Sequence, residues 1–325
     1  MKRKSKIHIV HLLSIAGVSG LLVKLHRKWF SEHYTGYTAK VIARSASDYY
    51  GFNDVYKEYG TYIGGKKALW FYLYVSLYLF FKRPKIIQIH ASITTLKMIN
   101  KFKKYIFYKP YLIYHAHGGD IRGKGLEEWL LANCDQVIVS TEDLKTHPDF
   151  RMLNCPIDHD LFFPLYHNLE KNGKALFINN FLQYEPKGLL QEAKDFCARM
   201  QLDLTVIDRM SSLTKKIETQ EEYMKIKKNQ GEFIPYKEMG NFYRKFEYFL
   251  DFKGLTKVQG KKKIFSKSAL EASYCGCKIA QEDGTIISPH QIREKLESGN
   301  VRFEIFYYYL WKNLTGSKSN EETYY

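Results

Sequence analysis

Residues 266–280 hold the side chains best suited to bind a ligand that carries both a sugar hydroxyl and a phosphate. Ser266 or Ser268 can cap the start of a short helix, and Gly276 can end it before a buried strand. This helix is expected to place Glu271 in its first turn, beside backbone N–H groups and the positive end of the helix dipole. A carboxylate there can accept hydrogen bonds from hydroxyls, while the helix start favours a phosphate.

The same residues also have a purely structural interpretation. The spacing Ser268-Ala-Leu-Glu271 fits a capping box, in which Glu271 does no more than cap its own helix. We expect the helix over residues 269–274 and the strand from Cys277 onward. Spacing alone leaves both interpretations open, so the rest of the chain has to decide between them.

Length and charge limit the kind of protein. The chain has 325 residues, 45% of them hydrophobic, which is enough for two domains with their own cores. Five scattered cysteines do not form a disulfide framework, and they favour a reducing compartment. Residues 1–119 carry 20 basic and four acidic side chains, so the whole formal charge of +16 lies in this part of the chain. We therefore expect an anionic partner.

An apolar run of 14 residues, from Ala68 to Phe81, lies within this basic region. It is shorter than the roughly 20 residues that cross a bilayer. Basic residues flank it on both sides: Lys66, Lys67, Lys82, Arg83 and Lys85. We expect the run to lie on an anionic membrane surface or to pack as a buried helix, in a cytoplasmic protein that is peripheral on the inner face of the membrane. A second aromatic stretch, residues 302–311, predicts a helix that packs on the body or adds to this surface.

Short apolar runs alternate with helical patterns along the chain, as is typical of parallel sheets with crossover helices. In the first half, strands are expected at residues 7–13, 39–43, 86–90, 111–115 and 136–140, and helices near 21–33, 67–82, 94–102 and 126–132. In the second half, strands are expected near residues 175–178, 204–207, 232–234 and 248–252, and helices near 188–200, 221–228 and 237–245. The pattern predicts an α/β fold of two Rossmann-like domains that face a central cleft.

The predicted domain boundaries follow this alternation. Residues 1–164 form a basic, membrane-facing Rossmann-like domain, and residues 165–300 form a second Rossmann-like domain. Residues 301–325 form a C-terminal helix and a polar tail. In the first domain, residues 14–20 form a glycine loop between a strand and a helix, where a ligand can approach the backbone. This loop has neither the dinucleotide fingerprint nor the Walker spacing, so it indicates only a generic phosphate or sugar loop.

Two alternative functions follow from other residues. His115 and His117 share one face of a predicted strand and could bind a metal together with Asp120, but no fourth ligand has a suitable spacing, so we expect no metal. Histidines that face the cleft explain the pattern better. The charge of +16 and the 26 tyrosines also suit a basic nucleic-acid-binding protein, yet RNP, KH and zinc-finger patterns are missing from the sequence. We do not expect nucleic acid as the partner.

Several segments resemble those of one protein family, in the same order along the chain. They are residues 16–19, 114–122, 134–144, 155–164, 233–243 and 266–280. Together they are similar to the glycosyltransferases with two Rossmann-like domains, the GT-B fold, and specifically to the retaining family-4-like branch (glycosyl transferases group 1). The chain resembles a divergent, archaeal-like member of this branch over nearly its whole length.

The resemblance implies a hexosyltransferase that moves a sugar from a nucleotide-diphosphate sugar to an acceptor, with retention. It makes residues 1–164 the acceptor-side domain and residues 165–300 the nucleotide-sugar donor domain. A lipid-linked or otherwise membrane-associated acceptor fits the charge asymmetry best, and a glycan is the other acceptor that the resemblance leaves open. The resemblance makes Glu271 the acceptor for the ribose hydroxyls, and Ser266 with the helix start the diphosphate site. Lys187 would neutralise the charge on the leaving diphosphate, so that neither a metal nor another cofactor is required. The resemblance also makes Gly17 and Ser19 part of the donor-binding loop.

The expected catalytic residues are therefore His117, which would contact the transferred sugar, together with Lys187 and Glu271. Two positions depart from the family. Asn180 stands where the family commonly has an arginine, and Lys263 stands where it has a glutamate that orients the donor sugar. Lys263 could replace the missing arginine at the diphosphate. The alternative is a catalytically degenerate protein that keeps the fold and binds without turnover.

Overall fold

The chain divides into two compact units in the computed structural model, which describes residues 7–14, 16–31, 37–44, 51–64, 68–105, 107–164, 173–179, 189–208, 234–252 and 265–315. Unit 1 comprises Met1–Ala46, Tyr56–Pro156 and Ser298–Tyr325. Unit 2 comprises Ser47–Val55 and Ile157–Glu297. The division differs from the sequence-based boundaries, because the chain enters unit 2 briefly near its start and returns to unit 1 after residue 297.

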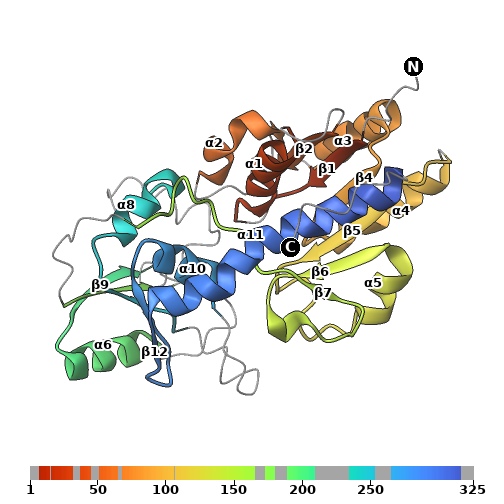
Figure 1. Ribbon diagram of the computed structural model, residues 1–325. Helices are drawn as coiled ribbons and strands as arrows, with labels where there is room; N and C mark the ends of the chain where they lie inside the picture. Colours follow the sequence, from red (N-terminus) through yellow and green to blue (C-terminus); the bar gives the residue numbers. More distant parts are fainter. Residues whose placement is uncertain are drawn as a thin grey trace. The chain divides into compact units, whose positions relative to one another are not determined.

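Unit 1 is built on a seven-stranded parallel sheet with the order β3-β2-β1-β4-β5-β6-β7 (Figure 1). Its strands are β1 (Ile7–Leu12), β2 (Tyr37–Arg44), β3 (Gly60–Ile63), β4 (Ile86–His90), β5 (Tyr111–Ala116), β6 (Gln136–Val139) and β7 (Arg151–Met152). Its helices are α1 (Val18–Ser31), α3 (Ala68–Lys82), α4 (Ile93–Tyr105) and α5 (Glu127–Asn133), with short 3-10 turns η2 (Lys57–Tyr59) and η3 (Glu142–Leu144). Every strand and helix that the sequence predicts between residues 7 and 140 is present within three residues, whereas the edge strands β3 and β7 are not predicted. The helix predicted at 302–311 is longer than expected, because it begins at Pro289.

Two helical layers cover the two faces of this sheet. Helices α3, α4 and α5 pack on one face through Phe71, Leu96 and Leu130. On the other face lie α1 and the second part of the long helix α11 (Pro289–Thr315), which contributes Phe303 and Tyr307 to the core. In Figure 1, α11 (blue) runs across the sheet in front of β4 and β5. The aromatic stretch at 302–311 therefore packs on the body of unit 1.

Helix α3 is apolar on two opposite sides. One stripe, Phe71, Val75 and Leu79, is buried in the core of unit 1. The other stripe is exposed and consists of Leu69, Trp70, Leu73, Leu77, Phe80 and Phe81. A wholly buried helix, one of the two expectations, is therefore wrong, because the sheet covers only one side of α3. Among the described helices, none combines the length and the apolar composition of a membrane span.

Unit 2 contains a five-stranded sheet with the order β12-β11-β10-β8-β9, parallel except for the pairing of β12 with β11. Its strands are β8 (Lys174–Asn179), β9 (Asp203–Asp208), β10 (Tyr248–Leu250), β11 (Lys278–Ala280) and β12 (Ile286–Ile287). Its helices are α2 (Phe52–Val55), α6 (Leu189–Met200), η4 (Tyr236–Glu238), α8 (Met239–Tyr243) and α10 (Lys267–Tyr274), together with the start of α11. The helix predicted at 237–245 forms as η4 followed by α8. The elements predicted at 221–228 and 232–234 include residues outside the described ones.

The second half of the predicted linker, 155–164, is anchored in unit 2. Arg244, which is buried, donates hydrogen bonds to the carbonyls of Phe163 (3.0 Å) and Leu161 (3.2 Å). Its guanidinium carbon Cζ lies 3.9 Å from the centre of the Phe163 ring. Gly240 touches the same backbone, since a Cβ there would lie 2.1 Å from the carbonyl oxygen of Leu161. This segment is therefore fixed to α8.

Candidate functional site

Helix α10 carries Glu271 and begins at Lys267, two residues before the predicted start. The Ser266 Oγ accepts a hydrogen bond from the Ala269 N–H at 3.0 Å, so Ser266 is the N-cap. Asp251 Oδ2 holds this residue in place by accepting a hydrogen bond from its N–H (2.9 Å). Glu271 consequently lies in the second turn, and the expectation that it lies in the first turn is wrong.

The capping-box interpretation is also wrong. It requires Ser268 as the cap, but Ser268 is the second residue of the helix. The carboxylate of Glu271 instead accepts hydrogen bonds from the Tyr236 hydroxyl (2.7 Å) and from the Lys267 ammonium (2.6 Å), both at Oε1. The hydroxyl and the ammonium also contact each other, at 3.0 Å. Glu271 is thus a buried carboxylate at the centre of a three-residue polar cluster.

Aromatic rings surround this cluster. The ring of Tyr236 lies 4.3 Å from that of Phe52 and 5.5 Å from that of Phe162, measured between centroids. The Lys267 ammonium lies over both Tyr236 (4.8 Å) and Phe52 (5.5 Å). The Oε2 atom of Glu271 makes no hydrogen bond to a described residue, so it can accept hydroxyl groups of a ligand at the edge of an aromatic wall. Tyr236 lies in the segment 233–243 that the sequence singles out, whereas Lys267 was missed, although its position four residues before Glu271 is the signal that could have identified it.

A second polar cluster lies in unit 1, at the carboxyl ends of β1, β4 and β5. Nδ1 of His11 is 3.1 Å from Nε2 of His90, and Nδ1 of His90 is 3.2 Å from Nε2 of His117. The rings of His115 and His117 lie 4.2 Å apart, as expected for side chains on one face of a strand. His11, His90 and His117 thus form a row of hydrogen-bonded imidazoles, and His117 is its partly exposed end. Folds of parallel strands bind ligands at the carboxyl ends of these strands.

The tautomer of His115 follows from its partners. The Gln88 amide nitrogen lies 3.1 Å from His115 Nδ1, and the Gln88 Oε1 accepts a hydrogen bond from the Tyr307 hydroxyl. Because the amide nitrogen can only donate, Nδ1 of His115 accepts, and its Nε2–H donates to Ser140 Oγ at 2.9 Å. His115 is therefore a neutral ring with both nitrogens in use.

Burial keeps this cluster uncharged. It lowers the pKa of His11 to about 3. Burial, with a smaller contribution from neighbouring histidines, also holds the pKa values of His90 and His115 well below the usual range. His26 on α1 behaves in the same way. At neutral pH the row of imidazoles therefore acts through hydrogen bonds.

Three of the clustered histidines form the one group of potential metal ligands in the described part of the chain. One nitrogen each from His90, His115 and His117 lie within 4.8 Å of one another. His90 replaces Asp120, which the sequence suggested as the third ligand. Asp120 Oδ1 accepts hydrogen bonds from the backbone N–H groups of His117 (3.1 Å) and Gly118 (2.8 Å), and Oδ2 accepts one from a tyrosine hydroxyl. Because both nitrogens of His90 and of His115 already have protein partners, the geometry is that of a hydrogen-bonded network.

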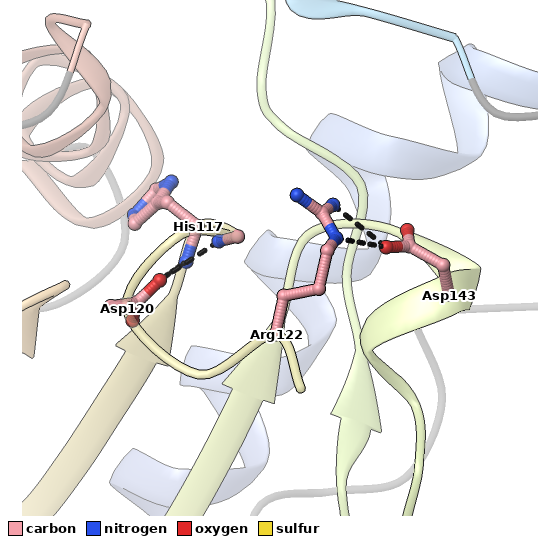
Figure 2. Close-up of polar contacts among 5 residues, drawn as sticks. His117, Asp120, Arg122 and Asp143 are labelled. Atoms are coloured by element: carbon pink, nitrogen blue, oxygen red, sulfur yellow. Dashed lines mark hydrogen bonds and ion pairs between the residues drawn. The ribbon is translucent and has the colours of Figure 1, made fainter. Parts of the chain in front are cut away.

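The loop after β5 presents two side chains next to this network. Figure 2 shows the His117 imidazole and the Arg122 guanidinium on the same side of the loop. Asp120 stabilises this loop by accepting a hydrogen bond from the backbone N–H of His117. Arg122 donates from Nε (3.0 Å) and Nη2 (2.7 Å) to one oxygen of Asp143, whose side chain is only 3% exposed. Gly118 has a φ of +131°, which few other residues adopt. The Arg122 side chain is 35% exposed and its Nη1 has no partner among the described residues, so Arg122 is a candidate anion-binding group; its place after Gly-Gly-Asp at a strand end is the signal that could have identified it.

The glycine loop of unit 1 lies between β1 and α1. Gly17 is buried and has a φ of +73°, in the left-handed region that favours glycine. Ser19 is fully buried, and its hydroxyl has no hydrogen-bond partner in the described structure. Gly20 serves packing, because a Cβ there would lie 2.5 Å from Cβ of Tyr56. Three further predicted site residues, Asn180, Lys187 and Lys263, lie outside the described residues.

No protein-family model matches the chain, and no curated protein matches its sequence. Solved structures do match. A glycosyltransferase from Rickettsia africae ESF-5 is similar over 97% of this chain and 100% of its own, with 9% identity and a TM-score of 0.56. A protein described as a UDP-N-acetylglucosamine 2-epimerase, from Listeria monocytogenes, matches over 99% and 100%, with 12% identity and a TM-score of 0.54. Anabaena HepE in complex with UDP and glucose matches over 85% and 80%, with 10% identity and a TM-score of 0.53.

These similarities concern the fold. The neighbours are two-domain proteins of the GT-B type, and the chain has this fold, as the sequence predicts. At identities near 10% they do not carry over residue roles. The geometry of the two polar clusters has to support the function on its own.

Proposed function

We propose that this protein is a retaining hexosyltransferase that moves a sugar from a nucleotide-diphosphate sugar to a membrane-associated acceptor, lipid-linked or glycan. The observation that carries the proposal is the buried carboxylate of Glu271, held by Tyr236 and Lys267 on a chain with the GT-B fold. A structural neighbour with UDP and glucose bound supports the class of donor. Because fold alone does not define function, the proposal rests on the chemistry of this cluster.

On the donor side, Oε2 of Glu271 would accept the ribose hydroxyls while Tyr236 and Lys267 hold Oε1. Ser266 and the start of α10 would take the diphosphate, together with Lys263 and Asn180. Lys187 would neutralise the charge that develops on the leaving diphosphate as the bond to the sugar breaks. With this positive field in place, we propose catalysis without a metal or another cofactor.

In unit 1, His117 would hydrogen-bond the transferred sugar, and Gly17 and Ser19 would belong to the loop that approaches the donor. The row His117–His90–His11 fixes the orientation of the His117 ring, because both nitrogens of His90 have a histidine partner, at 3.1 Å and 3.2 Å. A held imidazole loses less conformational entropy on binding than a mobile one.

Helix α3 supports a location at a membrane. Its six exposed apolar side chains form a stripe that ends in Lys82 and Arg83. Such a stripe buries apolar area in the bilayer interface, and each basic residue near anionic lipid adds about 1 kcal/mol. Five free thiols fit a reducing compartment, so we propose the inner face of the cytoplasmic membrane.

The test of the donor site is a thermal-shift screen with a panel of nucleotide sugars. At least one donor should raise the melting temperature of the wild type, and Glu271→Ala and Lys187→Ala should each lose that shift. Glu247→Ala is the matched control, since Glu247 is a partly exposed glutamate of the same unit. If no nucleotide stabilises the wild type, or if both variants respond as it does, the donor-site assignment fails.

Two further measurements separate the remaining parts of the proposal. Incubation with the stabilising donor and a lipid extract should consume donor and glycosylate lipid, whereas conversion of the donor to its epimer would place the protein beside the epimerases. Vesicle co-sedimentation tests the membrane. The variant Trp70→Ser/Leu73→Ser/Leu77→Ser should lose binding, and indifference of the wild type to lipid charge would contradict the proposed surface.

A further inference from the structure

Unit 1 contains a basic cavity on the edge of its sheet opposite to the histidine cluster. The cavity has a volume of about 940 Å³ and is lined by the C-terminal ends of α4 and α5 and by the loop from α4 to β5. These segments all precede strands, so they lie at the amino ends of β5 and β6. The Asn100 side chain joins the two helix ends by donating to the carbonyl of Asn133 at 2.9 Å. The cavity is thus separate from both polar clusters.

Positive charge collects around this cavity. Five of its lining residues are lysines: Lys97, Lys101, Lys103, Lys104 and Lys109. One carboxylate, Asp135, also lines it, and this group accepts a hydrogen bond from the Leu112 N–H at 2.7 Å. Within the described residues none of the five lysine side chains forms an ion pair or a hydrogen bond, and the Lys97 ammonium lies over the Trp129 ring at 5.4 Å. The chain has no acidic residue from Tyr59 to Gly119 that could neutralise them.

Exposed aromatic side chains border the cavity. Phe107 is 94% exposed and adopts a φ of +48°, and Tyr105 is 82% exposed. Two large exposed aromatic side chains next to several lysines are typical of a surface that lies in a bilayer interface. The Tyr108 hydroxyl donates to the Pro84 carbonyl and so ties this loop to the end of α3, next to the exposed Phe81.

We propose that the cavity binds the phosphate group of an anionic phospholipid while Tyr105 and Phe107 enter the bilayer interface. Lysine ammonium groups are mobile point charges with three donors each, which suits a phosphate that approaches from a fluid surface. The exposed apolar stripe of α3 belongs to the same helical layer as α4 and α5, which favours lipid over a nucleic acid. The site rests on the proposed membrane association and adds to it a defined binding site for the phosphate group of one lipid.

Charge-matched variants test the site in vesicle co-sedimentation with phosphatidylcholine alone and with added phosphatidic acid or phosphatidylglycerol. Lys97→Gln/Lys101→Gln/Lys104→Gln should lower the affinity for anionic vesicles about 100-fold, given a several-fold contribution from each lysine. The control Lys145→Gln/Lys194→Gln/Lys237→Gln removes the same charge from exposed positions elsewhere and should change affinity by about threefold or less. Equal losses in the two variants would overturn the site, because they would show a response to net charge alone.

A soluble competitor and a loop variant distinguish the source of the phosphate. Glycerol 3-phosphate should compete only weakly with vesicles, and Phe107→Ser should weaken vesicle binding about tenfold without a change in circular dichroism. If glycerol 3-phosphate binds the wild type tightly and Phe107→Ser binds vesicles as the wild type does, the cavity takes a soluble phosphate and the lipid proposal is overturned. The donor-induced thermal shift should be unchanged in the triple-lysine variant, so a failure here is distinct from a failure of the donor site.

Discussion

The Nδ1 atom of His90 lies 3.2 Å from the Nε2 atom of His117, so a fully buried ring directly contacts a partly exposed one. His90 also contacts His11 through its other nitrogen at 3.1 Å. Because a neutral imidazole has one N–H, the proton position on any ring in this row fixes the positions on the other two. The row therefore couples the loop after β5 to the interior of unit 1. Because its buried rings resist protonation, the free energy of unfolding should fall at low pH.

The first prediction concerns stability against acid. His11 has a folded pKa of about 3, below the usual 6.5, so between pH 6.5 and 3 the unfolded chain binds a proton that the folded chain does not. Stability from this residue is fully present above pH 6.5, and about 2 kcal/mol of it should be lost on acidification to pH 5. His26, His90 and His115 shift in the same direction. Urea denaturation from pH 7.5 to 5 should show this decline.

A pair of variants assigns the decline to buried histidines. His26→Phe should reduce the slope of the unfolding free energy against pH by the equivalent of about one bound proton, because the buried ring that resists protonation is gone. His290→Gln, at an exposed position, should leave it unchanged. The same slope in both variants would show that other groups cause the acid sensitivity.

The second prediction compares two ion pairs of unit 2. Lys267→Gln leaves the 5%-exposed carboxylate of Glu271 without its cation and should cost about 1–3 kcal/mol of unfolding free energy. Lys278→Gln breaks a pair of similar length, 2.9 Å, whose side chains are 44% and 24% exposed, and should cost less than about 1 kcal/mol. Chemical denaturation measures both. A larger loss for Lys278→Gln would mean that burial does not govern these pairs.

The third prediction concerns the contact between α8 and the linker. Gly240→Ala would place a methyl group 2.1 Å from the Leu161 carbonyl oxygen, so the backbone must move, and we expect a loss of about 2–4 kcal/mol. Gly119→Ala is the control, because a Cβ at that position has no heavy atom within 4 Å. It should change stability by less than about 0.5 kcal/mol. If Gly240→Ala unfolds at the wild-type urea concentration, the linker is not packed as described.

The fourth prediction tests metal independence. Elemental analysis of the untagged protein should find no stoichiometric transition metal, and EDTA should leave the melting temperature unchanged, since the nitrogens of His90 and His115 already have hydrogen-bond partners. Bound zinc that EDTA removes with a loss of stability would contradict this. In that case His117→Ala should abolish metal binding and assign the histidine cluster as the site.

Local patterns predicted the strands of the fold well, because each buried parallel strand is a short apolar run between polar turns. The register of α10 was not predictable in the same way. Ser266 and Ser268 are equivalent candidates for the cap in sequence, and Asp251, fifteen residues away, selects Ser266 by binding its N–H. This selection moves Glu271 out of the first turn.

The sequence also did not predict which residues from distant segments contact the site residues. Tyr236 lies 35 residues before Glu271, and nothing in the spacing shows that its hydroxyl reaches the carboxylate. His90, by contrast, could have been found. The sequence predicts that two strands end at His90 and His115, and parallel neighbours would place these two residues side by side, which is their register in the sheet.

Helix α11 joins residues far apart in the chain into one core, and this has a consequence for the order in which the protein folds. Phe303, Phe306, Tyr307 and Leu310 pack with Ile9 and Val18 on the face of the sheet in unit 1. During synthesis, the first strands leave the ribosome long before their covering helix has been made. All segments of unit 2 are synthesised before residue 298, so unit 2 can fold before the core of unit 1 is complete. Until residues 298–315 emerge, the part of this face that α1 does not cover stays open to chaperones and to aggregation.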